Sequence, residues 1–169
     1  AKKAFINAEN INELIINNIF FKDVGLLSID IDGNDYWIWK SLNCIKSSIV
    51  VIEYNARFGF QKSVTVPYKK NFKRQKEHHS SVYFGASLAA LHNLGNEKGY
   101  SLVGTNLNGN NAFFVRSDLV KENNILTFTP EECFNINSFN ELRDKNGNIL
   151  EKNILEEEKI LNSLPLEEV

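Results

Sequence analysis

The alternation of continuous apolar runs with helical spacings along the chain predicts an α/β fold. Apolar runs that end in acidic residues are typical of buried parallel strands, whereas apolar residues three and four positions apart are typical of helices. The predicted strands cover residues 3–6, 24–31, 48–54, 100–104 and 112–116. The predicted helices cover residues 10–21, 34–43 and 81–94, the last of them closed by Gly95. Strands and helices in this order indicate a sheet with helices on both faces.

Charge divides the chain into a core and an extension. Residues 1–120 carry 14 basic and 10 acidic side chains, whereas residues 121–169 carry 5 basic and 11 acidic ones. In the second part, Thr129 and Glu132 have the spacing of a capping box, and a charged helical pattern ends at Pro165. We therefore expect a core domain in residues 1–120 and an acidic helical extension in residues 121–169 that packs on it.

Composition places the chain among globular domains. Its 169 residues are 43% hydrophobic, and no apolar run approaches the roughly 20 residues of a membrane span. Cys44 and Cys133 lie far apart, as expected of reduced thiols in a cytoplasmic protein. The chain contains no methionine and opens directly into a predicted strand. We therefore expect that sequence upstream of Ala1 is missing.

Acidic and polar side chains follow two of the predicted buried strands. Asp30 and Asp32 end the first strand, and Glu53 and Asn55 end the second. Side chains two residues apart share one face of a strand, and ligands bind at the carboxyl ends of parallel strands. On neighbouring strands these four side chains would converge, either to bind and activate a substrate or to hold Mg²⁺ or Mn²⁺. In the alternative, Asp30 or Asp32 only caps the turn, and Glu53 pairs with Arg57 or a lysine.

A long basic connection covers residues 56–80, and a loop of this length in a compact domain is usually functional or disordered. Against a single acid, Glu77, it carries the basic residues Lys62, Lys69, Lys70, Lys73, Arg74 and Lys76. This charge suits a substrate that bears phosphate or carboxylate, and sparse aromatic residues argue against nucleic acid. His79 is a candidate general base because imidazole titrates near neutrality. In the alternative, the connection is a solvated loop.

Two tyrosines are candidates for binding a substrate. Tyr36 follows the first acidic turn, and Tyr83 opens a segment of small residues. Tyr36, with Trp37 and Trp39, could form the wall of a sugar or adenine site, or in the alternative pack a helix against the sheet. The small residues after Tyr83 permit close approach of the backbone, either to a ligand or to the sheet.

Several segments together resemble a bacterial family of S-adenosylmethionine-dependent methyltransferase-like proteins related to the FkbM type. The segments that carry this resemblance are residues 26–37, 50–55, 66–68, 83–88, 98–100 and 110–116. The resemblance extends into the extension through residues 142–144 and 164–166, so it covers nearly the whole chain. Members of this family are mostly uncharacterised, so the resemblance implies a fold and a cofactor more firmly than a substrate.

The resemblance implies the C-terminal part of a class I methyltransferase sheet, which is Rossmann-like. The strand before Asp30 would be its fourth, the strand before Glu53 its fifth, and the last two strands its closing antiparallel pair. The turn formed by Asn7, Ala8, Glu9 and Asn10 would contact the adenine of the cofactor, and Asp30 would face the methyl donor. The glycine-rich loop that holds the cofactor's methionine end has no match in this sequence, so the N-terminal strands are expected to be missing.

The expected function is methyl transfer from S-adenosylmethionine to an oxygen or nitrogen of a small polar or sugar-like acceptor. Asp30, Asp32, Glu53 or His79 would orient or deprotonate this acceptor. Two alternatives remain open. The Asp30-Ile31-Asp32 pattern also suits a metal-dependent glycosyltransferase that uses a nucleotide sugar. A methyltransferase-like domain without catalysis could also serve as a binding module.

Overall fold

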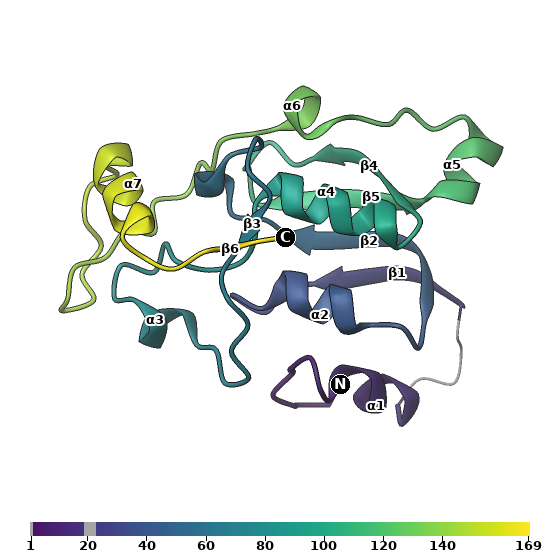
Figure 1. The fold of residues 1–169 in the computed structure, drawn as a ribbon, viewed down its shortest axis with the longest axis horizontal. Helices are drawn as coiled ribbons and strands as arrows, with labels where there is room; N and C mark the ends of the chain where they lie inside the picture. Colours follow the sequence, from purple (N-terminus) through teal and green to yellow (C-terminus); the bar gives the residue numbers. More distant parts are fainter. Residues whose placement is uncertain (1, 19–22) are drawn as a thin grey trace.

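The computed structural model describes residues 2–18 and 23–169, and its centre is a four-stranded mixed sheet. The spatial order of the strands is β1-β2-β5-β4 (Figure 1). Their bounds are β1 Asp23–Ile29, β2 Lys46–Glu53, β4 Tyr100–Thr105 and β5 Asn111–Arg116. β1 and β2 are parallel, whereas β5 is antiparallel to both β2 and β4. The prediction of an α/β fold is therefore confirmed.

Two helices cover one face of this sheet, in front of the strands in Figure 1. They are α2 (Asp35–Ser41) and α4 (Leu88–Glu97), and Trp39 of α2 packs on Phe114 of β5 with 4.9 Å between ring centroids. On the opposite face of β2, Ile49 remains 38% exposed. The packed helices that the structure describes thus lie mainly on one face rather than on both.

The N-terminal region differs from the expected strand and helix. Residues 2–7 form no strand, because they lie beside no strand of the described sheet. Helix α1 spans only Ile11–Ile16, and the end of the longer helix expected there falls on residues 19–22, outside the described residues. β1 was expected to be buried, yet Leu26 is 56% exposed. Side chains alternate between the faces of a strand, and Leu26 lies on the face opposite that of Leu27 and Ile29, which pack in the core.

Helix α4 begins later and ends later than its sequence suggests. Ser87 caps it, since the Ser87 hydroxyl accepts a hydrogen bond from the Ala90 N–H at 3.1 Å. Residues 81–86 form no helix, and Ser81 and Gly85 among them have positive φ. Gly95 lies inside the helix and does not close it, because it makes room for the rings of Phe114 and Trp39.

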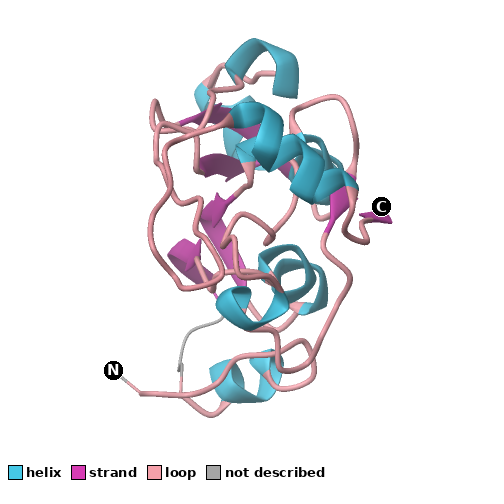
Figure 2. Ribbon diagram, turned by 90° about the vertical axis from the view of Figure 1, so that its left-hand side faces the viewer, coloured by secondary structure: helices cyan, strands magenta, loops and turns pink. Residues whose placement is uncertain are grey.

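The C-terminal residues run from the amino ends of β1 and β2 to their carboxyl ends. Helix α5 (Ser117–Asn123) follows β5, contains the expected boundary at residue 120, and lies near the amino ends of β1 and β2 (Figure 1). From there the chain returns through α6 (Pro130–Cys133), which has the predicted capping box, to the carboxyl ends. Helix α7 (Ile154–Asn162) is followed by β6 (Glu167–Glu168), which pairs with β3 (Val64–Thr65). Figure 2 views this end of the sheet, where loops cross the strand ends.

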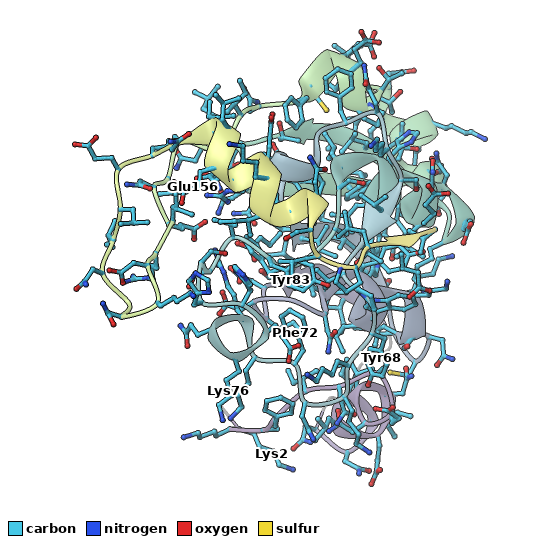
Figure 3. All side chains as sticks on the ribbon, turned by 60° about the vertical axis from the view of Figure 1, so that its left-hand side comes forward. Lys2, Tyr68, Phe72, Lys76, Tyr83 and Glu156 are labelled. Carbon is cyan, nitrogen blue, oxygen red and sulfur yellow. The ribbon has the colours of Figure 1, made fainter. Side chains whose placement is uncertain are left out.

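A second apolar cluster joins the basic connection to the C-terminal residues. Its buried members are Val66, Phe72, Val82, Tyr83, Phe84, Leu142 and Leu161. The connection also contains the 3₁₀ helix η1 (Ala56–Phe58) and the short helix α3 (Arg74–Glu77). In Figure 3, Phe72 and Tyr83 lie inside the molecule, whereas Lys2 and Lys76 lie at its periphery. The apolar side chains of the connection are therefore packed, whereas its lysines are exposed to solvent.

Candidate functional site

Carboxylates meet where β1 and β2 end. Ile29 pairs with Ile52 in the parallel register, which places the next residues, Asp30 and Glu53, side by side. Glu53 is only 9% exposed, and its Oε2 has no hydrogen-bond partner among the described residues. Burial, together with the charges of Asp35 and Asp30, raises the pKa of Glu53 to about 8. A buried carboxyl with this pKa is close to the protonation balance that proton transfer near neutral pH requires.

Asp30 and Asp32 lie at the exposed rim of the same group. Partial burial and the charge of Asp32 raise the pKa of Asp30, while the Arg74 guanidinium opposes this shift. Arg74 Nη1 lies 3.3 Å from Asp32 Oδ1, and the Asp32 side chain is 70% exposed. The structure thus brings Asp30, Asp32 and Glu53 together as the sequence suggested, and their catalytic roles stay predictions.

The residue that fixes this turn is Asp35, which the sequence analysis did not single out. Its carboxylate accepts hydrogen bonds from the N–H groups of Ile31 and Gly33, each at 2.9 Å. The side chain is fully buried, and burial raises the pKa of Asp35 to about 6 against the lowering effect of these hydrogen bonds. Between the two bonded residues, Asp32 adopts a left-handed conformation with φ of 58°. Asp35, rather than Asp30 or Asp32, therefore ties down the turn.

A hollow of about 200 Å³ lies against this turn, between it and the N-terminal segment. Its walls are mostly apolar and are formed by Ala4, Phe5, Ile6, Ile31, Asn34 and Phe72. The Asn34 Nδ2 donates to the Lys69 carbonyl at 2.9 Å, but the buried Asn34 Oδ1 has no partner among the described residues. The hollow is thus lined by two aromatic side chains and by Asn34, whose buried Oδ1 has no partner among the described residues.

The predicted adenine turn is built but lies just outside this hollow. The Asn7 and Asn10 side chains each accept a hydrogen bond from the other's backbone N–H at 2.9 Å. The Tyr68 hydroxyl accepts from the Ala8 N–H at 3.2 Å and donates to Glu9 Oε2 at 2.6 Å. The residues just before this turn line the hollow instead. The contact of residues 7–10 with adenine stays a prediction.

The side chain of Asn55 forms hydrogen bonds with the backbone around it. Its Nδ2 donates to the carbonyls of Val82 and Phe84 at 2.9 and 3.0 Å, and its Oδ1 accepts from the Arg57 N–H. The side chain is fully buried. In this arrangement the amide holds the strand ends together and presents neither of its N–H groups to a ligand.

Both predicted substrate tyrosines are occupied by internal contacts. Tyr36 is 4% exposed and packs edge-on against Trp37. Tyr83 is 5% exposed, and its hydroxyl donates to the Pro165 carbonyl at 2.5 Å. In the described arrangement, packing accounts for both rings, and for Tyr36 this agrees with the alternative that the sequence left open.

His79 is exposed and stacks on His78, with 4.2 Å between the ring centroids. The His78 ring is itself fixed by a 2.7 Å hydrogen bond between its Nδ1 and the Ser80 hydroxyl. Burial and the neighbouring His79 lower the pKa of His78. Among the described contacts, none joins His79 to the carboxylates, so its role as a base stays a prediction.

Ion pairs connect the carboxylate site to the C-terminal helix. Arg74, next to Asp32, also lies 2.9 Å from Glu141. Arg57 lies 3.2 Å from Glu141 and 2.7 Å from Glu157. Arg57 therefore pairs with these two acids and not with Glu53. The network Asp32–Arg74–Glu141–Arg57–Glu157 joins segments that periodicity along the chain could not relate.

Comparison of the chain with protein-family models, with curated proteins and with solved structures gave no match. Within residues 2–18 and 23–169, no helix is both long and apolar enough to cross a bilayer. Within the same ranges, no three His, Cys, Asp or Glu side chains are arranged to hold a metal ion. The expected Mg²⁺ or Mn²⁺ therefore stays a prediction.

Proposed function

We propose that this chain is part of a methyltransferase that uses S-adenosylmethionine and methylates an oxygen or nitrogen of a small polar acceptor. The observation that carries the proposal is the apolar hollow beside the end of β1. Its free acceptor, Asn34 Oδ1, suits the exocyclic amino group of an adenine. The side chains of Phe5 and Phe72 suit the faces of a flat heterocycle. When bound, S-adenosylmethionine would supply the methyl group.

The topology of the sheet supports the same proposal. The resemblance to methyltransferases implies two parallel strands followed by a closing antiparallel pair. The observed order β1-β2-β5-β4 has two parallel strands, and β5 lies antiparallel between β2 and β4. The hollow and the carboxylates also lie at the carboxyl ends of β1 and β2, where open α/β sheets bind ligands.

The carboxylates would prepare the acceptor. Glu53, with its pKa raised to about 8, would take the proton that the acceptor loses, and Asp30 would orient the acceptor's hydroxyl or amine. The rest of catalysis would be positioning of donor and acceptor in line. The exposed rim at Asp32 leaves an opening through which a small acceptor could enter.

The test is thermal unfolding of the chain with S-adenosylhomocysteine, compared with UDP-glucose plus Mn²⁺. Ligand at a hundred times its dissociation constant adds about 2.7 kcal/mol of stability, which raises the melting temperature by about 5–10 °C. We expect this shift with S-adenosylhomocysteine. A shift only with UDP-glucose would overturn the proposal in favour of a glycosyltransferase, and no shift with either would leave a non-catalytic binding module.

Two tryptophan variants, one that fills the hollow and one at an exposed position, provide a matched comparison. Ile31→Trp should occupy the space for the adenine and abolish the shift with S-adenosylhomocysteine. Leu107→Trp, at a side chain that is 88% exposed in the turn between β4 and β5, should leave the shift unchanged. Equal shifts in both variants would show that the cofactor does not bind in this hollow.

A further inference from the structure

A second hollow, of about 150 Å³, lies beside Arg74. All the side chains that line it are polar, and they include Asp32, Arg74, Ser81, Glu141 and Arg143. They come from the turn after β1, from α3, from the segment before α4 and from the C-terminal extension. A lining without apolar side chains indicates a small, strongly polar ligand.

Ser81 contributes a buried hydroxyl to the lining of this hollow. It is 6% exposed, and its hydroxyl has no hydrogen-bond partner among the described residues. A buried hydroxyl without a partner costs free energy that a ligand can recover. Ser81 also has a φ of 61°, and Asp32 has a φ of 58°. These are two of the three non-glycine residues with positive φ in the described chain, and such strain is concentrated at binding sites.

The charges inside the hollow are fixed and separated. Arg74 is held by the Ser81 carbonyl, which accepts from its Nε at 2.5 Å, and it stacks on the Phe84 ring at 3.6 Å. Arg74 pairs with Glu141 at 2.9 Å and, through its Nη1, with Asp32 Oδ1 at 3.3 Å. Asp32 Oδ2 makes no hydrogen bond among the described residues, so this oxygen and the guanidinium of Arg143 remain for a ligand.

Arg143 lies directly beside the strained serine. Its backbone N–H donates to the Ser80 carbonyl at 3.1 Å, and its Nη1 donates to the Gly147 carbonyl at 2.8 Å. The other N–H groups of its guanidinium make no hydrogen bond within the described residues, and they can bind a carboxylate in the bidentate way that arginine favours. The hollow thus has an anionic end at Asp32 and a cationic end at Arg143.

We propose that this hollow binds a small zwitterion of the α-amino acid class. The ammonium of the ligand donates to the Asp32 carboxylate and to the Ser81 hydroxyl, and its carboxylate accepts from Arg143. The small volume restricts the ligand to a short side chain. The binding site does not depend on methyl transfer, and it therefore stands or falls separately from the proposed cofactor.

The test is a titration of the ¹⁵N-labelled chain, followed by amide chemical shifts, with L-alanine and three partial analogues. L-Lactate lacks the ammonium, ethylamine lacks the carboxylate, and glycerol is uncharged. We expect L-alanine to shift the amides of Asp32, Ser81 and Arg143 in a saturable way. We expect at least tenfold weaker binding of each analogue. Equal shifts with L-lactate or glycerol, or no saturable shift with L-alanine, would overturn the proposal.

Three variants test the contacts without breaking the fold. Ser81→Gly removes the hydroxyl and suits the positive φ, Asp32→Asn keeps a residue that tolerates this conformation, and Arg143→Gln removes the cation. Each should weaken binding of L-alanine at least tenfold. The matched controls are Asp23→Asn, at the first residue of the strand that precedes this turn, and Lys145→Gln, two residues after Arg143, and neither should weaken binding. Loss in the controls, or none in the three variants, would contradict the assignment.

Discussion

Arg57 and Glu157, a hundred residues apart in sequence, form an ion pair with 2.7 Å between Nε and Oε2. Their side chains are only 6% and 5% exposed. The pair joins the end of β2 to helix α7 and therefore anchors the C-terminal extension to the core. Through Glu141 and Arg74 it also reaches Asp32 at the candidate site.

Loss of one partner of this pair should be costly. Glu157→Ala leaves the buried Arg57 charge with only the half-buried Glu141, so we expect a loss of about 3 kcal/mol in the free energy of unfolding. Glu158→Ala, on the exposed side of the same helix, should change it by less than about 0.5 kcal/mol. Urea unfolding of both variants measures the difference. Equal effects would show that the ion pair does not stabilise the fold.

The buried carboxyl of Glu53 should make stability depend on pH. Its pKa of about 8 in the folded state exceeds the value of 4.5 expected when unfolded. The folded state therefore holds the proton more tightly, and stability falls as pH rises from about 4.5 to 8. Between pH 6.5 and 9, above the pKa of about 6 of Asp35, the decline comes mainly from Glu53. We expect Glu53→Gln to flatten the change in melting temperature over this range, and an unchanged slope would contradict the assignment.

A side chain at Gly33 should disturb the hollow that Phe72 lines. A Cβ built there overlaps the ring of Phe72, and the φ of Gly33 is 155°. We expect Gly33→Ala to cost about 2–4 kcal/mol of stability and to abolish the shift with S-adenosylhomocysteine, because Phe72 must move. Gly147→Ala also carries a positive φ but has open space around its Cβ. It should cost only about 1 kcal/mol and keep the shift, which separates backbone strain from the steric overlap.

Gly95 should be an exception to the usual preference of helices for alanine. In most helices Gly→Ala gains about 1 kcal/mol, but a Cβ on Gly95 would lie 2.9 Å from the Phe114 ring and 3.1 Å from Trp39. We therefore expect Gly95→Ala to cost about 1–3 kcal/mol through overpacking. Gly25→Ala, where nothing lies within 4 Å, should be neutral or slightly stabilising. Thermal unfolding of the two variants compares them directly, and a gain at Gly95 would refute the packing argument.

Local patterns predicted the elements whose causes are local. The apolar runs before Asp30 and Glu53 form the parallel pair β1 and β2, and the capping box at Thr129 forms α6 as expected. The convergence of Asp30, Asp32 and Glu53 also followed from strand direction alone. These features depend on residues within a few positions of one another and on general rules for parallel sheets.

Features decided by distant contacts could not be read in this way. Residues 81–86 carry a helical pattern, but Gly85 adopts a φ of 67° and the Asn55 amide binds the carbonyls of Val82 and Phe84. These tertiary hydrogen bonds outweigh the local preference. The pairing of Arg57 with Glu141 and Glu157 spans 84 and 100 residues, and periodicity carries no information over such a distance.

The second apolar cluster imposes an order on folding during synthesis. Val66 and Phe72 belong to the middle of the chain, but they are buried against Leu142 and Leu161 near its end. Ribosomes add about 5–20 residues per second, so roughly 5–20 seconds separate the synthesis of Val66 from that of Leu161. During that interval the sheet can assemble, while Leu142 and Leu161 are not yet present to pack against the basic connection. The nascent chain therefore exposes these apolar side chains to chaperones until helix α7 has emerged.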